Sequence, residues 1–174
     1  MMKKDNKRER GGKEMVKREF DQKVVEIKRV TRVVAGGKRM RFRALVVIGD
    51  RKGKVGMGLR KGVDVAEAVN KAVNAAKKNM IIVPLINDTI PHQVKLKYAS
   101  SRILLIPARP GTGIIAGGAL RSVLDLAGVK NILSKMLGSS NKVNNVKAVF
   151  EAFKKMKTPE QMKRRAKAAA AAAK

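Results

Sequence analysis

The sequence contains no cysteine and no tryptophan, and only 3% of its 174 residues are aromatic. The absence of cysteine excludes disulfide bonds, thiolate zinc sites and a cysteine nucleophile. The scarcity of aromatic rings argues against a protein that recognises single-stranded nucleic acid mainly by base stacking. No apolar run approaches the length that a helix needs to cross a membrane.

Acidic residues are also scarce: 13 Asp and Glu stand against 41 Lys and Arg, so the formal net charge is +28. Such a chain repels itself when compact unless a polyanion neutralises it. Nucleic acid is the favoured polyanion, ahead of an anionic membrane, because the cations fall on expected strands and turns rather than along one amphipathic helix. Apolar residues still make up 44% of the chain, which predicts a folded core.

The motifs of nucleotide-binding enzymes are incomplete. Gly-Lys pairs at 12–13, 37–38 and 53–54 are not followed by Ser or Thr, so none forms a Walker loop. The glycines between residues 56 and 62 have the spacing G-x-G-x-x-x-G, which departs from the dinucleotide fingerprint. An enzyme of nucleotide or phosphoryl chemistry therefore remains only as the alternative function, and a membrane-surface protein as a weaker one.

Residues for acid–base and metal chemistry are few. His92 is the only histidine, and its simplest interpretation is a polar residue at a strand edge. The acids form no H-E-x-x-H or D-x-D pattern, and six of the thirteen lie within the first 26 residues. We therefore expect no catalysis, no metal and no cofactor.

The first half of the chain predicts one small α+β domain over residues 22–83, after a basic arm (1–21) that we expect to be disordered alone. Strands are expected at 24–34, 41–49 and 54–62, with a turn or loop at 35–40. Asp64 and Glu67 form a D-x-x-E capping signal for a following helix. Its expected apolar stripe consists of Val65, Val69, Ala72, Val73, Ala76 and Met80.

The second half predicts a separate α/β domain over residues 84–157, followed by a basic, alanine-rich tail (158–174). Pro84 and Pro91 mark the linker. Strands are expected at 92–99 and 101–108, a helix at 114–128 that Gly128 stops, a strand within 129–137, and an amphipathic helix at 141–156. The buried face of that last helix consists of Val143, Val146, Val149, Phe150 and Phe153.

Positive charge is concentrated between residues 27 and 62, where twelve cations accompany a single acid, Asp50. A merely soluble surface would mix both signs, so we interpret this segment as a face that docks on a phosphate backbone. The twelve candidate RNA-binding residues are Lys28, Arg29, Arg32, Lys38, Arg39, Arg41, Arg43, Arg51, Lys52, Lys54, Arg60 and Lys61.

Glycines accompany these cations. Where glycine lacks a side chain, RNA can approach the bare backbone, although turn formation and strand twist explain the same residues without RNA. The candidates for backbone approach are Gly36, Gly37, Gly53, Gly56 and Gly58.

A second glycine-rich stretch, PGTGIIAGGALR (110–121), has two interpretations. Gly111 and Gly113 at a helix start can hold an anion on free N–H groups. Alternatively, the small residues 116–119 form a smooth surface for close packing, against this chain or another protein. The residues alone favour packing.

Five segments in order resemble the bacterial-type family of the fifth protein of the small ribosomal subunit, over residues 22–157. The run PGTGIIAGGALRSVLDLAGV is the most specific of them. The segments are IKRVTRVVAGGKRMRFRALVVIGD, GKVGMGLRKGVDVAEAVNKAV, IPHQV, PARPGTGIIAGGALRSVLDLAGVKNILSKMLGS and NKVNNVKAVFEAF.

The resemblance implies an α+β protein: a three-stranded sheet plus helix, like a double-stranded-RNA-binding domain, followed by a small α/β two-layer sandwich. It implies binding to small-subunit ribosomal RNA near the junction of body and head. The loop matching 33–39 would help to discriminate tRNA near the spectinomycin site.

The resemblance also implies partners and a location. The segment Gly111, Thr112, Gly113 to Arg121 would pack on ribosomal protein four, and the family also contacts protein eight. With proteins three and four it lines the mRNA entry channel. The chain is therefore expected in a cytoplasmic ribosome, or in an organelle ribosome if it is organelle-encoded, without a membrane partner.

Overall fold

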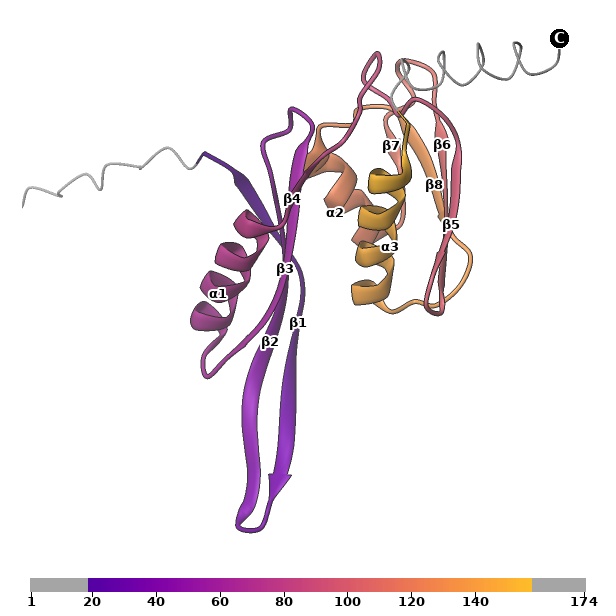
Figure 1. The fold of residues 1–174 in the computed structure, drawn as a ribbon. Helices are drawn as coiled ribbons and strands as arrows, with labels where there is room; N and C mark the ends of the chain where they lie inside the picture. Colours follow the sequence, from indigo (N-terminus) through magenta and orange to yellow (C-terminus); the bar gives the residue numbers. More distant parts are fainter. Residues whose placement is uncertain (1–18, 158–174) are drawn as a thin grey trace, which may run out of the picture.

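The computed structural model describes residues 19–157, which form two four-stranded sheets and three helices (Figure 1). The expected basic arm, apart from its last residues, and the alanine-rich tail lie outside the described residues. The elements are β1 (Asp21–Val34), β2 (Gly37–Gly49), β3 (Lys54–Gly62), α1 (Val65–Lys78), β4 (Met80–Ile82), β5 (Val94–Tyr98), β6 (Ser101–Pro107), β7 (Ile114–Ile115), α2 (Gly118–Ala127), β8 (Ile132–Met136) and α3 (Lys142–Lys155).

The elements stack in four layers, with α1 outermost, then the first sheet, then α2 and α3, then the second sheet (Figure 1). The first sheet has the strand order β1-β2-β3-β4 and the second β5-β6-β8-β7. The expected fold class, an antiparallel sheet with a helix followed by an α/β domain, is confirmed. No helix within residues 19–157 is long and apolar enough to cross a membrane.

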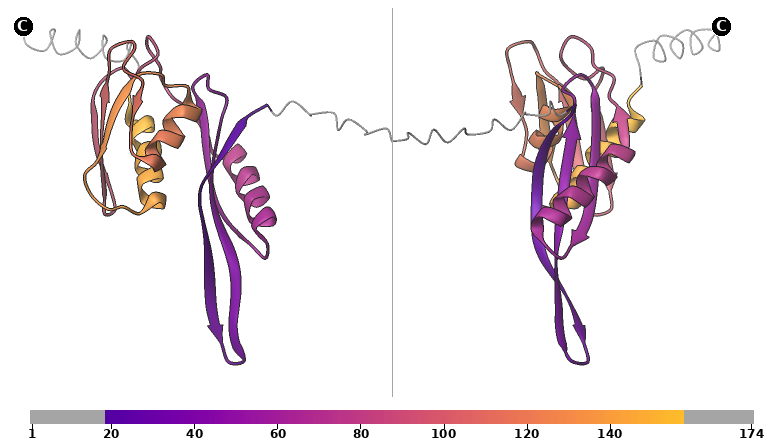
Figure 2. Two further views of the ribbon diagram at one scale, coloured as in Figure 1. Left: turned by 180° about the vertical axis from the view of Figure 1, so that it is seen from behind. Right: turned by 90° about the vertical axis from the view of Figure 1, so that its left-hand side faces the viewer.

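The hairpin of β1 and β2 is longer than the sequence pattern predicts. The strands pair from Asp21 with Gly49 to Val34 with Gly37, so only Ala35 and Gly36 remain in the turn. The expected turn is therefore present but shorter than residues 35–40, because β2 already begins at Gly37, whose φ of 137° allows the chain to reverse immediately. The hairpin consequently projects well beyond the rest of the first sheet (Figure 2).

The first sheet also has a fourth strand that the sequence pattern does not reveal. Met80, Ile81 and Ile82 leave α1 and pair with the start of β3. Three apolar residues are too short for a periodicity of two to be recognised, so the expected three-stranded sheet gains this edge strand.

The inner half of β2 is buried on both faces. Ala44, Val46 and Ile48 pack toward α1, whereas Leu45 and Val47 join the core that contains α2 and α3. Two-sided burial explains why the sequence becomes continuously apolar here instead of alternating. The face of the first sheet that holds Leu45 and Val47 also forms one core cluster with the second domain, so the two domains share a core.

Helix α1 packs on β3 through the strand's glycines. A Cβ atom at Gly58 would lie 1.9 Å from the Ala72 carbonyl oxygen, and one at Gly56 would lie 2.4 Å from that of Ala76. These glycines let the backbones approach closely, so alanines form most of the buried helix face. Val65, which the predicted stripe included, is exposed. The buried helix residues are Ala68, Ala72, Ala75 and Ala76.

Only half of the predicted capping pair forms at the start of α1. Asp64 makes no side-chain cap, whereas Glu67 Oε2 accepts a hydrogen bond from the Val63 N–H at 2.7 Å. The hydrogen bond from Lys71, and then that N–H, lower the pKa of the Glu67 carboxyl. Their stabilisation is present above the carboxyl's ordinary pKa and is lost as the pH falls through the lowered one.

The second domain differs from its prediction in one place. Ile114 and Ile115 form the short strand β7, parallel to β8, and α2 begins only at Gly118. The predicted helix start at 114 is therefore wrong, because the β-branched pair extends the sheet first. Gly128, at φ 84°, ends α2 as expected, and the predicted strand and final helix appear as β8 and α3.

We predict that Gly58→Ala lowers the free energy of unfolding by about 3 kcal/mol, because its Cβ would meet backbone atoms that cannot move independently. The control is Gly36→Ala, which has no atom within 4 Å of its new Cβ and should change stability by less than about 0.5 kcal/mol. Urea denaturation measures both. Equal stabilities would contradict the packing of α1 on β3.

Candidate nucleic-acid interface

The candidate cations are available to a ligand: eleven of the twelve are exposed and Arg43 is half-buried. Strand register then determines which of them share a face, since residues opposite each other in antiparallel strands point to the same side. Arg43 lies opposite Lys28 on β1 and Lys61 on β3. Arg39 lies opposite Arg32. Because side chains alternate along β2, Arg41 lies on the same face, between Arg39 and Arg43.

Six cations therefore share one face of the protruding hairpin and the neighbouring end of β3. We call this surface the basic face; it consists of Lys28, Arg32, Arg39, Arg41, Arg43 and Lys61. It is continuous with the side of the sheet that holds Leu45 and Val47, so it begins where the second domain stops covering the sheet.

Like charges stand directly opposite each other on the basic face, which destabilises a sheet. Glu26 relieves one end, because its carboxylate lies 3.4 Å from Lys28 Nζ and 3.9 Å from an Arg43 nitrogen. Within residues 19–157, Arg32, Arg39 and Arg41 have no carboxylate within 4.0 Å. The far end of the hairpin thus carries uncompensated charge.

The uncompensated end is also hollowed. A shallow depression of about 300 Å³ lies over the hairpin, and three arginines and a lysine supply most of its rim. Its lining residues are Val30, Thr31, Arg32, Arg39, Arg41 and Lys61. A concave surface with cations around it suits a rounded anionic strand better than a flat neutral partner.

The other candidate cations lie elsewhere. Arg29 and Lys38 project from the opposite side of the hairpin, and Arg60 lies opposite Ala44 on the α1 side of the sheet. The cations of the 50–54 turn sit at the far end of β2, against the second domain: the Arg51 N–H donates to the Leu126 carbonyl at 3.1 Å. The twelve cations thus form three separate groups rather than one surface.

The glycine candidates divide in the same way. Gly36 and Gly37 are exposed at the hairpin tip, and a Cβ at either would meet no atom within 4 Å. Gly53 is buried, and its N–H donates to the Ala127 carbonyl at 3.0 Å. Gly56 and Gly58 are buried beneath α1. These positions correct the expected RNA approach at residues 53, 56 and 58, since helix packing and chain turns already occupy that backbone.

In the glycine-rich segment at 110–121, the helix begins only at Gly118, so Gly111 and Gly113 do not lie at its start. Gly111 and Gly113 precede α2 by several residues and have φ values of 90° and 73°, so they are glycines because the turn requires them. The Gly113 N–H already donates to Asn131 Oδ1 at 3.1 Å. The interpretation of an anion held at the helix start therefore does not apply. Gly111, Thr112 and Arg121 are exposed.

Catalytic groups do not gather in the described residues. His92 Nδ1 is buried without a hydrogen-bond partner there. No cluster of three or more potential metal ligands occurs between residues 19 and 157. The chemistry that this surface offers is the binding of phosphate groups.

Two family models match the chain. The model described as ribosomal protein S5, N-terminal domain, matches residues 20–84, and the model described as ribosomal protein S5, C-terminal domain, matches residues 96–166. Together they cover most of the sequence.

The chain belongs to the ribosomal protein S5 family. This family is a structural, non-enzymatic component of the small ribosomal subunit, and its members associate with ribosomal RNA and other ribosomal proteins. The chain's location is therefore the ribosome, and its basic face belongs to an rRNA-binding protein of translation.

We predict that Arg39→Glu raises the free energy of unfolding of the free protein by about 1 kcal/mol at low salt, because repulsion across from Arg32 becomes attraction. The control is Lys135→Glu, which makes the same reversal of charge at a position opposite the uncharged Leu104. It should therefore stabilise the protein less. Denaturation at two salt concentrations measures both, and the gain should shrink as salt screens the pair. A loss of stability in Arg39→Glu would show that the arginines do not repel.

Proposed function

We propose that the chain binds small-subunit ribosomal RNA through the basic face and the tip of the β1–β2 hairpin, near the junction of body and head. The observation that carries this proposal is the unrelieved row of Arg32, Arg39 and Arg41 on a protruding hairpin. Phosphate groups on an RNA strand would neutralise these cations and release counterions, which favours association.

The tip adds backbone contacts to this interface. Gly36 and Gly37 have open space around them, so a sugar-phosphate strand can come close to their amides without meeting a side chain. Val33 and Met40 are strongly exposed beside the tip and are available for apolar contact with sugars or bases. Inserted into RNA, the tip would let the protein support decoding accuracy and the discrimination of tRNA.

Protein partners are proposed for the second domain. Gly111, Thr112, Gly113 and Arg121 would contact ribosomal protein four, and the domain would also contact protein eight. Exposed Ile115, Met136 and Leu137 supply apolar surface close to this segment. With proteins three and four the chain would line the mRNA entry channel. The ribosome would be cytoplasmic, or that of an organelle if the gene is organelle-encoded.

We predict that Arg32→Ala/Arg39→Ala weakens binding to small-subunit RNA about tenfold or more at low salt. Because two phosphate contacts are removed, the slope of log affinity against log salt concentration should become shallower by roughly two. Filter binding across a salt series measures both quantities.

A matched control is Lys142→Ala/Lys155→Ala, which removes two exposed cations from α3 and should change neither quantity appreciably. If the two double variants behave alike, net charge rather than the basic face drives association. A binding affinity that does not respond to salt would remove the proposed interface altogether.

A further inference from the structure

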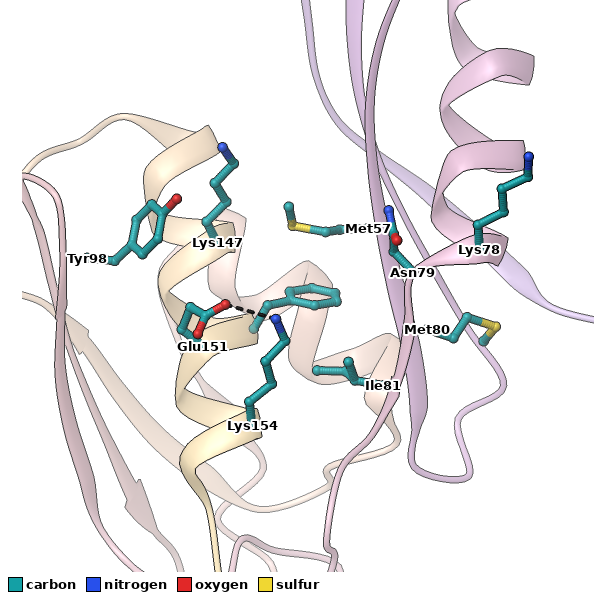
Figure 3. A pocket seen from close by; sticks show the side chains of 10 residues that line it. Met57, Lys78, Asn79, Met80, Ile81, Tyr98, Lys147, Glu151 and Lys154 are labelled. Atoms are coloured by element: carbon teal, nitrogen blue, oxygen red, sulfur yellow. Dashed lines mark hydrogen bonds and ion pairs between the residues drawn. The ribbon is translucent and has the colours of Figure 1, made fainter.

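A cleft lies at the seam between the two domains (Figure 3). Its volume is about 480 Å³, within the range of small-ligand sites. One wall comes from β3 and the α1–β4 junction, and the other from β5 and α3. The residues that line this seam cleft are Met57, Lys78, Asn79, Met80, Ile81, Tyr98, Lys147, Phe150, Glu151 and Lys154.

The interior of the seam cleft is apolar and partly aromatic. Tyr98 is half-buried in one wall, Phe150 is 5% exposed, and the Met57 thioether projects between the walls (Figure 3). Lys147 Nζ lies 6.0 Å from the centre of the Tyr98 ring, so this ring is within reach of polar groups rather than sealed by apolar packing. Because Phe150 is almost fully buried, Tyr98 is the ring in this cleft on which a base can stack.

The rim of the seam cleft is cationic. Lys147 and Lys154 reach the rim from α3, whereas the Lys78 side chain runs along α1, away from Lys147 (Figure 3). Glu151 is the one carboxylate among the lining residues, and it lies 2.9 Å from Lys154 Nζ. Lys78 and Lys147 have no carboxylate within 4.0 Å among residues 19–157. The cleft thus combines an apolar interior with a net positive edge.

We propose that the seam cleft binds one unpaired nucleotide of RNA. Its base would stack on Tyr98 between the apolar walls, and its phosphate would lie beside Lys147. The Asn79 side chain, which carries both a donor and an acceptor at the cleft edge, can hydrogen-bond to a base edge. This proposal rests on the proposed RNA-binding function and adds a second, single-stranded site to it.

The chemistry of the rim selects this occupant over others. A purely apolar side chain from a protein partner would leave the unpaired Lys147 without a counter-charge. A phosphate alone would leave the apolar interior empty. A nucleotide satisfies both, because it joins a flat ring to an anion. An acidic protein segment is the remaining competitor, and ligands that carry phosphate without a base separate it from a nucleotide.

Tyr98 makes the site directly observable, because it is the only tyrosine in the chain. Isotope labelling of tyrosine therefore gives NMR ring signals from this cleft alone. Adenosine 5′-monophosphate should shift these signals upfield in a saturable manner, since a stacked base adds its ring current. Ribose 5-phosphate, which keeps the sugar and phosphate but lacks the base, should leave them nearly unchanged. No saturable shift with the nucleotide, or equal shifts with both ligands, would overturn the proposal.

Variants test the roles of individual residues. Lys147→Ala should weaken adenosine monophosphate binding about threefold, whereas Lys155→Ala, on the same helix but outside the cleft, should not. Line broadening of the nucleotide's own protons reports on the tyrosine variants. Tyr98→Ala should lose at least about fivefold in affinity, and Tyr98→Phe should retain it because the stacking ring remains. Loss in Tyr98→Phe equal to that in Tyr98→Ala would contradict stacking.

Binding to a fully paired RNA duplex separates this proposal from the proposed function. Tyr98→Ala and Lys147→Ala should bind the duplex within about twofold of the parent, because paired bases cannot enter the cleft. If the duplex binds normally but adenosine monophosphate does not, the seam site is wrong and the basic face stands. If the duplex does not bind, or if its binding does not weaken steeply as the salt concentration rises, the proposed function itself is wrong.

Discussion

Burial of β2 on both faces is the constraint on which the rest of the molecule depends. Residues 44–48 are held between α1 on one side and the helices of the second domain on the other. Full burial of each large side chain there contributes about 1.5–3 kcal/mol. A directly opposed pair of like charges costs a fraction of that, so the anchored half of the strand can support an outer half that repels itself.

This arrangement separates stability from binding along a single strand. The inner residues of β2 hold the two domains together, and the outer residues, Gly37 to Arg43, extend the hairpin beyond them. The basic face would be an unfavourable design for a protein that acts alone. For a member of a ribosomal protein family, whose surroundings contain a dense array of phosphates, the same repulsion becomes a source of affinity.

Some of this architecture could be predicted from the sequence, and the physical reasons are specific. The apolar periodicity of α3 and the β-branched runs of β1 and β2 define those elements because burial and period agree. Charge counting located the basic segment, but strand register divides its twelve cations into three groups, and register depends on the exact hairpin turn. The sequence therefore could not show that Arg32 faces Arg39 while Lys38 points away.

Other features depend on contacts between distant segments. Glycine at positions 56 and 58 suits a turn, a nucleic acid or a packed helix equally well, and only the position of Ala72 and Ala76 decides among them. The seam cleft joins Tyr98 to residues of α1 and α3 that no local pattern connects. The residues alone favoured nucleic acid as the polyanionic partner, and the family resemblance added the ribosomal context.

The most direct test of the central claim is amide hydrogen exchange of the β1–β2 hairpin, measured by mass spectrometry with and without small-subunit RNA. Repulsion in the free protein should let residues 28–34 and 37–43 exchange quickly, and phosphate contacts should slow them strongly. The β5–β6 pair provides an internal reference, where a smaller change is expected. Unchanged exchange in the hairpin, with RNA demonstrably bound, would contradict the account.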